Sequence, residues 1–301
     1  MRVLHPGFPR TATTTLQQAV FPHHPQLAFL GVPAAEPALD QLLRGIAETD
    51  STRFDATETA AGLAPHLALP PGRSTLLLSF ENLTLYEARD KGVVAARLRT
   101  LFGPARIMFT LRRQDELAAS WYLQKIRKYI DDHHYVSPQR YFRMKLREPG
   151  RSILGDLDFE ATVACYERLF GAGNVRLFAY EQLRADPAAF AADVAGFLAV
   201  DPGPLQELLH AARLNRGETR RRLAKARLVD RYLPRAVLDR GRRLLPRGLR
   251  AGVERWLDGG ERASVALPAA VRDWIDGQCR RGNRALDARY GGLLGRWGYP
   301  L

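Results

Sequence analysis

A cluster of hydroxyl side chains follows the first predicted strand, in the stretch HPGFPRTATTTLQ over residues 5–17. Four threonines lie where a helix is expected to begin: Thr11, Thr13, Thr14 and Thr15. Backbone N–H groups at a helix start, together with hydroxyls, form a site for an anion. Arg10 adds a fixed charge and a fork of donors. The stretch lacks the Gly-Lys-Ser/Thr ending of a Walker loop. A threonine-capped helix without a ligand is the alternative interpretation.

A second pair of residues suited to a phosphate lies in LRRQDELAASWY, residues 111–122. Arg112 comes at the end of a predicted strand, and Ser120 follows eight residues later, about two turns into the next helix. A loop between them could bring a guanidinium and a hydroxyl onto one phosphate. Arginine and serine are both common residues, so without further evidence Arg112 and Ser120 are equally well explained as solvated surface side chains.

A carboxylate follows the predicted strand in LLLSFENL, residues 76–83. Ligands of parallel α/β sheets bind at the carboxyl ends of the strands. Glu81 is therefore expected near the anion site, where it could accept a proton from a reacting hydroxyl. A glutamate favoured by the dipole of a nearby helix start is the alternative.

Histidines are the competing proton acceptors. His23 and His24 precede a proline and are expected to shape a turn. His133 and His134 follow two aspartates in an expected exposed loop near the site. Because no second ligand cluster accompanies them, no metal site is expected.

The elements that must position these groups alternate along the chain. Short apolar strands are predicted at residues 3–4, 74–80, 105–111 and 174–180, with helical periodicity between them. This order predicts an α/β fold with a parallel sheet flanked by helices. Beyond residue 205 the pattern is helical and basic. We expect one domain over 1–301, with an α/β core at 1–204 and a helical extension at 205–301 packed on it.

Charge and composition indicate which kinds of partner the protein could bind and in which compartment it is expected. The chain carries 45 Lys or Arg and 32 Asp or Glu, for a net charge of +13. An anionic partner is expected, whether nucleotide, acidic glycan, nucleic acid or membrane surface. The two cysteines show no paired spacing, which favours a reducing compartment. No apolar run reaches the ~18 residues of a membrane span, and no signal-peptide pattern opens the chain. These features predict a soluble, cytoplasmic protein of undetermined oligomeric state.

Taken together, the stretches resemble sulfotransferases of the bacterial type that use 3'-phosphoadenosine 5'-phosphosulfate (PAPS). Residues 9–16 are similar to the family's 5'-phosphosulfate loop, and Arg112 with Ser120 to its 3'-phosphate motif. YEQLRADP at 180–187 and GRWGYP at 295–300 match later family segments. The resemblance implies a P-loop-like sulfotransferase fold and transfer of a sulfuryl group from PAPS to a hydroxyl, without a metal. The acceptor could be a glycan, a lipid-linked glycan, a phenol or a small alcohol.

The resemblance also assigns roles to individual residues. It implies that the 5'-phosphosulfate is held by Arg10, Thr11, Ala12, Thr13, Thr14 and Thr15. Arg112 and Ser120 would hold the 3'-phosphate, Tyr180 would contact the adenine, and Arg10 and Glu81 would be catalytic.

Two positions depart from the family pattern. Arg10 replaces a lysine, and since arginine is a poor proton donor its expected role is to neutralise charge. Ala12 replaces a glycine and is expected to have no positive φ. The family's C-terminal Arg-Lys-Gly loop is not evident, and LNRGE at 214–218 is only a loose match.

Two other classes of function remain as alternatives. A nucleotide-dependent kinase should carry Gly-Lys-Thr and a magnesium-binding aspartate, and neither is evident. A basic nucleic-acid-binding protein should interleave aromatic residues with its charges. The segment 215–250 holds 13 Lys or Arg but only one aromatic residue, Tyr232. No nucleic-acid partner is therefore expected. The helical stretch 220–233 within it is read as a solvated surface, with arginines facing the nucleotide or an acidic acceptor as the alternative.

Overall fold

The computed structural model describes residues 1–85, 90–131, 135–212, 219–221, 223–225, 252, 256–257, 259–261 and 263–301. The chain divides into two compact units. The first comprises Met1–Gln114, Pro149–Asn215 and Trp274–Leu301, and the second comprises Asp115–Glu148 and Arg216–Asp273. The expectation of a single domain with a packed helical extension stays a prediction.

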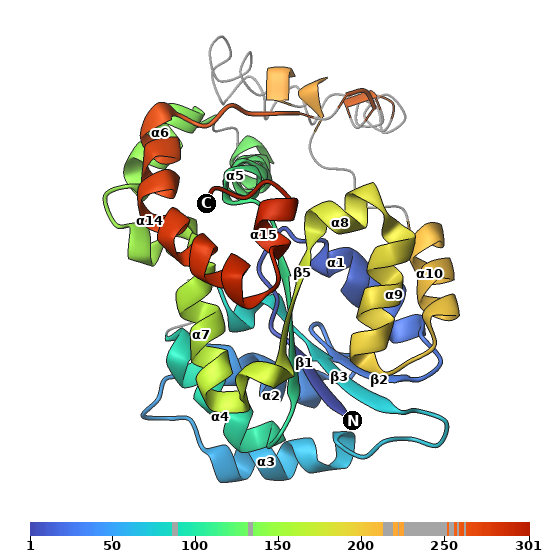
Figure 1. Cartoon of the computed structure of the whole chain (residues 1–301). Helices are drawn as coiled ribbons and strands as arrows, with labels where there is room; N and C mark the ends of the chain where they lie inside the picture. The colour runs from blue at the N-terminus through green and yellow to red at the C-terminus, as the bar shows by residue number, and fades with distance from the viewer. Residues whose placement is uncertain are drawn as a thin grey trace. The chain divides into compact units, whose positions relative to one another are not determined.

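A five-stranded parallel sheet forms the centre of the first unit, in the order β2-β3-β1-β4-β5 (Figure 1). Its strands are β1 (Arg2–His5), β2 (Leu27–Gly31), β3 (Thr75–Ser79), β4 (Arg106–Leu111) and β5 (Val175–Ala179). The predicted α/β class and four of these strands are confirmed. The sequence analysis missed β2, a five-residue strand between two proline-containing turns.

Helices cover both faces of the sheet, as side-chain alternation along buried strands requires. In the first unit the helices of eight or more residues are α2 (Pro37–Glu48), α3 (Ala56–Leu63), α4 (Lys91–Phe102), α7 (Phe159–Phe170), α9 (Pro187–Leu198) and α10 (Pro202–Ala211). Two short helices are α8 (Tyr180–Ala185) and α15 (Leu293–Arg296). An aspartate caps the first turn of α4, α7 and α9: Asp90, Asp158 and Asp186.

Within the second unit's residue ranges, or extending into them, the helices of eight or more residues that the structure describes are α5 (Gln114–Asp131), α6 (Pro138–Lys145) and α14 (Ala269–Arg289), of which α14 continues into the first unit. The helical C-terminal region expected from the sequence is present in α14 and α15. Most of the basic segment 215–250 and all of LNRGE at 214–218 lie outside the described residues.

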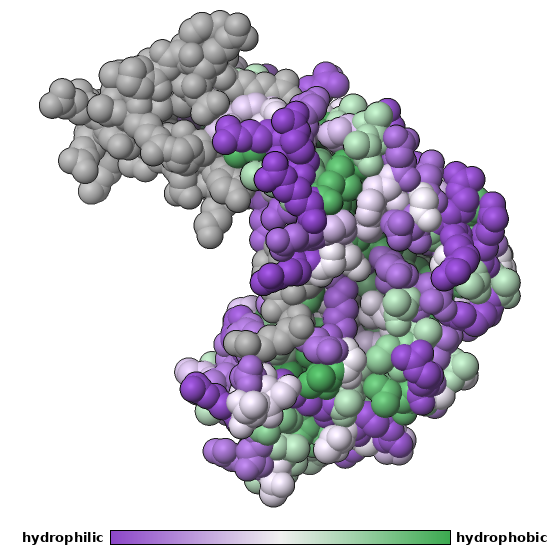
Figure 2. Space-filling model, turned by 90° about the vertical axis from the view of Figure 1, so that its left-hand side faces the viewer, coloured by the Kyte–Doolittle hydropathy of each residue, from purple (hydrophilic) through white to green (hydrophobic). Residues whose placement is uncertain are grey.

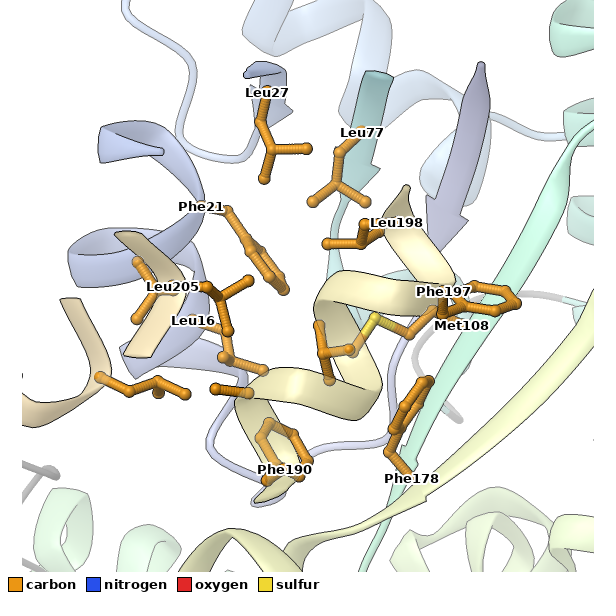
Figure 3. Packing of buried hydrophobic residues seen from close by; sticks show 14 of the residues in the cluster. Leu16, Phe21, Leu27, Leu77, Met108, Phe178, Phe190, Phe197, Leu198 and Leu205 are labelled. Atoms are coloured by element: carbon orange, nitrogen blue, oxygen red, sulfur yellow. The ribbon is translucent and has the colours of Figure 1, made fainter. Parts of the chain in front are cut away.

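One face of the sheet packs on the helical segment that follows β1 and on α9, and α10 packs against these two helical elements. Figure 3 shows Leu16 and Phe21 from that segment among Leu77, Met108 and Leu198. All five side chains are buried. On the opposite face Phe109 of β4 meets Tyr166 of α7 edge to face, with ring centroids 5.1 Å apart. The segment carrying the threonine cluster is therefore anchored directly in the hydrophobic core.

The surface is mixed in character. Hydrophilic residues predominate on the described part of the face in Figure 2, and hydrophobic residues show between them as small patches. Of the helices in the described ranges, none combines the length and apolar character that crossing a membrane demands.

Candidate functional site

The predicted anion loop connects β1 to a helical segment in the first unit. Thr13–Thr15 form α1, which continues as a π-helical turn, Leu16–Val20, and a 3-10 turn, Phe21–His23. The predicted helix start at the threonine cluster is confirmed. The first turn of a helix leaves backbone N–H groups without intrahelical acceptors, so these groups are available to an anion at this point.

Two residues of the loop adopt a left-handed backbone conformation. Arg10 and Ala12 both have φ of 66°. The expectation that Ala12 avoids positive φ is therefore wrong. A Cβ in this region costs roughly 1–2 kcal/mol, and surrounding contacts must hold it. The Thr11 hydroxyl donates to the carbonyl of Phe8 at 2.7 Å, and the N–H of Leu16 donates to the carbonyl of Ala12 at 3.0 Å. Left-handed residues of this kind turn backbone N–H groups into anion-binding concavities.

Gly7 lets the loop pack closely against β1. Its φ is +59°, and a Cβ there would lie 3.1 Å from Cγ2 of Thr13 and 3.3 Å from Nε2 of His5. The carbonyl of Gly7 also accepts a hydrogen bond from the Thr84 hydroxyl, in the segment after β3. The loop is thus held from both sides by neighbouring strand ends.

The threonine hydroxyls have different surroundings. Thr11 is buried and its hydroxyl bonds within the loop, so it supports the loop's shape. Thr13 is also buried, and its hydroxyl donates to Oε2 of Glu81. Thr15 is buried, whereas Thr14 is half-buried. We therefore expect Thr14 to be the most accessible hydroxyl of the cluster.

Glu81 begins a 3-10 turn, Glu81–Leu83, directly after β3. It is half-buried, and the hydrogen bond from Thr13 brings its carboxylate against the start of α1. The sequence-based placement of Glu81 beside the loop is confirmed. Its role as a base stays a prediction.

Arg112 and Tyr180 meet at the carboxyl ends of β4 and β5. The Arg112 guanidinium carbon lies 4.6 Å from the centroid of the Tyr180 ring, a cation–π arrangement. Nη1 of Arg112 donates to the carbonyl of Arg10 at 3.2 Å. The strand order places β3, β1, β4 and β5 side by side, so Glu81, the loop, Arg112 and Tyr180 follow four adjacent strands. Ser120 lies on α5 in the second unit, and its pairing with Arg112 stays a prediction.

The sequence analysis missed a buried polar network under the loop. His5, the last residue of β1, is fully buried; its Nδ1 lies 2.7 Å from the Ser79 hydroxyl and its Nε2 lies 3.1 Å from the Thr110 hydroxyl. Gln17 donates to the same Ser79 hydroxyl at 3.0 Å. Burial lowers the pKa of His5 from 6.5 to about 4, so its imidazole is neutral at pH 7. The sequence feature that could have indicated this network is His5, the first residue of the stretch HPGFPRTATTTLQ.

The other histidines have different positions. His24 is buried in the turn before β2, where its Nδ1 accepts from the N–H of Gln26 and its Nε2 lies 3.1 Å from the carbonyl of Asp201. Its predicted turn-shaping role is confirmed. In a parallel sheet the start of β2 lies at the end opposite to Glu81. His133 and His134 lie outside the described residues. Within the described ranges no group of three or more His, Cys, Asp or Glu is arranged to hold a metal ion.

Comparison with known proteins identifies the fold. No protein-family model and no curated protein matches the sequence. Among solved structures, the chain is similar to a sulfotransferase from Alicyclobacillus acidocaldarius, with 15% identity and a TM-score of 0.56 over 98% of this chain and 97% of that one. A sulfotransferase domain from the Synechococcus PCC 7002 olefin synthase aligns with 14% identity over 69% of this chain and 79% of that one, at a TM-score of 0.41. The first of these likenesses shows that this chain has the sulfotransferase fold.

Proposed function

We propose that the protein is a sulfotransferase that transfers a sulfuryl group from PAPS to a hydroxyl of an acceptor. The observation that carries the proposal is the contact between Arg112 and the carbonyl of Arg10. It brings the predicted 3'-phosphate arginine to the predicted phosphosulfate loop, at the edge of the sheet where α/β folds bind ligands. The sulfotransferase fold supports the same class of reaction.

The donor nucleotide would be held from two sides. The loop offers the left-handed backbone of Arg10 and Ala12 and the helix start at Thr13 to the 5'-phosphosulfate. Arg112, joined by Ser120, would bind the 3'-phosphate through charge-assisted hydrogen bonds. Tyr180 lies against Arg112 and offers a ring to the adenine.

The reaction is written as an in-line displacement at sulfur. The acceptor oxygen forms a bond to sulfur while the bond from sulfur to the 5'-phosphate oxygen breaks, leaving 3'-phosphoadenosine 5'-phosphate (3',5'-ADP). The acceptor's proton passes to the Glu81 carboxylate, which Thr13 orients. Arg10 and the N–H groups at the helix start neutralise the charge that develops on the leaving phosphate. Positioning and electrostatics supply most of the acceleration, and no metal takes part.

The acceptor is a hydroxyl compound, such as a glycan, a lipid-linked glycan, a phenol or a small alcohol. We propose that it is met in the cytoplasm, and that the basic segment 215–250 contributes to binding an acidic acceptor or a membrane surface. Incubation of the protein and PAPS with an extract of the host, followed by intact-mass detection of sulfated products, identifies it.

Calorimetric titration tests the donor assignment. The protein is expected to bind 3',5'-ADP more tightly than ATP with magnesium, because ATP lacks the 3'-phosphate. A charge-assisted contact contributes ~1.5–3 kcal/mol, so Arg112→Ala should remove most of the preference. Arg176→Ala is the matched control, since Arg176 is exposed on β5. Equal affinity of the unmodified protein for the two nucleotides contradicts the proposal.

A further inference from the structure

The segment Gly298–Pro300 is linked through hydrogen-bonded side chains to the two residues that directly follow Arg112. The Glu181 carboxylate accepts two hydrogen bonds at this point. One comes from the backbone N–H of Arg113 to Oε1 at 2.9 Å, and the other from the Tyr299 hydroxyl to Oε2 at 3.0 Å. Tyr299 is buried and Glu181 is half-buried. One carboxylate therefore joins the segment after β4 to a residue near the end of the sequence.

A second set of buried hydrogen bonds holds the next residue. Gln114 donates to Oδ1 of Asn283 at 2.7 Å, and Asn283 donates to the carbonyl of Pro300 at 2.8 Å. Gln114 and Asn283 are both buried. Arg113 and Gln114 are thus each tied to the Gly298–Pro300 segment through one intermediate side chain.

Both Arg113, which follows Arg112 in the chain, and Tyr180, whose ring contacts the guanidinium, are linked to Glu181. Arg113, held by Glu181, is next to Arg112 in the chain. Tyr180, whose ring lies 4.6 Å from the Arg112 guanidinium carbon, is next to Glu181. By accepting from the N–H of Arg113, the Glu181 carboxylate therefore also holds the Arg112 guanidinium against the Tyr180 ring. The Tyr299 hydroxyl is one of the donors that orient this carboxylate.

We infer that Tyr299 is a positioning residue for Arg112, acting through Glu181 to place the guanidinium for the 3'-phosphate of the nucleotide. The inference rests on the proposed function. Loss of the Tyr299 hydroxyl leaves the Oε2 atom of a half-buried carboxylate without this donor, and the carboxylate can then rotate away from the N–H of Arg113. The 5' end of the nucleotide is held by the loop after β1, which Arg112 contacts at the carbonyl of Arg10, so binding of the 5' end is expected to change less than binding of the 3'-phosphate.

The test compares two nucleotides that differ by a single phosphate. Calorimetry gives the dissociation constants of 3',5'-ADP and 5'-AMP, and their ratio reports the 3'-phosphate contact alone. Tyr299→Phe is expected to reduce this ratio by about tenfold, the order expected for a weakened charge-assisted hydrogen bond. Its affinity for 5'-AMP should change less than its affinity for 3',5'-ADP, because the 5' end is held mainly by the loop after β1.

Tyr290→Phe is the matched control. The Tyr290 hydroxyl also donates to a glutamate at 2.7 Å, but this glutamate is Glu167 of α7 and not Glu181 beside Arg113. This variant is expected to keep the ratio of the unmodified protein. If it lowers the ratio as much as Tyr299→Phe does, the effect is general loosening and the inference is wrong.

The remaining outcomes separate the inference from the proposed function. An unchanged ratio in Tyr299→Phe, or an equal loss of affinity for both nucleotides, overturns the positioning role. Equal affinity of the unmodified protein for the two nucleotides overturns the proposed function instead. Should Tyr299→Phe fail to fold, Glu181→Gln serves, because its amide keeps the size of the carboxylate and must likewise reduce the ratio.

Discussion

The hydroxyl of Thr13 donates a hydrogen bond to Oε2 of Glu81 at 2.5 Å, across 68 residues of sequence. This contact joins the helix start that would hold the donor to the carboxylate that would accept the proton. A base tied in this way is oriented before the acceptor arrives, which reduces the reorganisation needed during the reaction. It also means that Glu81 could act on the loop as well as on the acceptor, and the two roles are separable.

Glu81→Gln separates the chemical role from the supporting one. The amide oxygen can still accept from Thr13, but the side chain no longer takes up a proton. Turnover is expected to fall about 10²–10⁴-fold, with the affinity for 3',5'-ADP nearly unchanged. Steady-state rates with PAPS and calorimetry of the nucleotide measure the two quantities. Turnover within about threefold of the unmodified protein would show that the base is another group.

Thr13→Val is the companion variant, because it removes the hydroxyl and keeps the shape. It is expected to weaken nucleotide affinity through the loop as well as slowing turnover. A Glu81→Gln protein that loses nucleotide affinity to the same degree would instead make Glu81 a structural support of the loop.

Ala12→Gly is expected to raise the free energy of unfolding. Ala12 has φ of 66°, where a Cβ costs roughly 1–2 kcal/mol and glycine's greater freedom in the unfolded chain costs about 0.5–1 kcal/mol. The net gain is about 0.5–1 kcal/mol by the same principles, measured by urea titration. The control is Ala61→Gly on the exposed side of α3, which should lose about 0.5–1 kcal/mol. Equal losses in both variants would refute the strain at Ala12.

Stability is expected to fall as the pH drops below 6.5. The unfolded His5 takes up a proton with its ordinary pKa of 6.5, whereas burial lowers the folded pKa to about 4. Protonation in this window therefore favours the unfolded chain, by up to ~1.4 kcal/mol per pH unit. Urea titrations at pH 7, 6 and 5 measure the effect, and His5→Gln should lack this part of the slope. An NMR titration in which the folded His5 ring protonates near pH 6.5 contradicts the prediction.

Sulfuryl transfer is expected to proceed unchanged in EDTA. Charge on the leaving phosphate is assigned to Arg10 and to the N–H groups at the start of α1, which supply the stabilisation a metal would otherwise give. The rate of product formation from PAPS, measured before and after chelation, tests this. Activity lost in EDTA and restored by a divalent ion would show that a cation is required.

Much of the architecture could be predicted from the sequence, because it depends on local patterns. Short apolar runs separated by helical periodicity identify β1, β3, β4 and β5, and the carboxyl ends of parallel strands lie at one edge. From that rule Glu81 was expected beside the loop, whereas the resemblance to sulfotransferases assigned Arg112 and Tyr180 to the same site. The helix start at Thr13 was expected from the threonine cluster, although the N-cap residue is Ala12 and no threonine side chain caps the helix.

The rest depends on contacts between distant residues. Ala12 has positive φ because surrounding hydrogen bonds hold the loop, and residue type alone argues against it. A histidine at the end of a strand resembles any core residue until its partners are known, and those of His5 lie 74 and 105 residues away. The hydrogen bond from Tyr299 to Glu181 spans 118 residues, and no local pattern announces it.

The place of β1 in the sheet determines which part of the site opens first. β1 is paired on both sides, by β3 and β4, whereas among the described strands β5 is paired with β4 alone. Amide hydrogens of a strand enclosed on both sides exchange with solvent only in the larger opening events, while those of an edge strand exchange in smaller ones. The strand that leads into Tyr180 is therefore expected to open before the strand that leads into the loop. Backbone amide hydrogens of β5, on the proposed adenine side of the site, are therefore expected to exchange faster than those of β1, on the proposed phosphosulfate side.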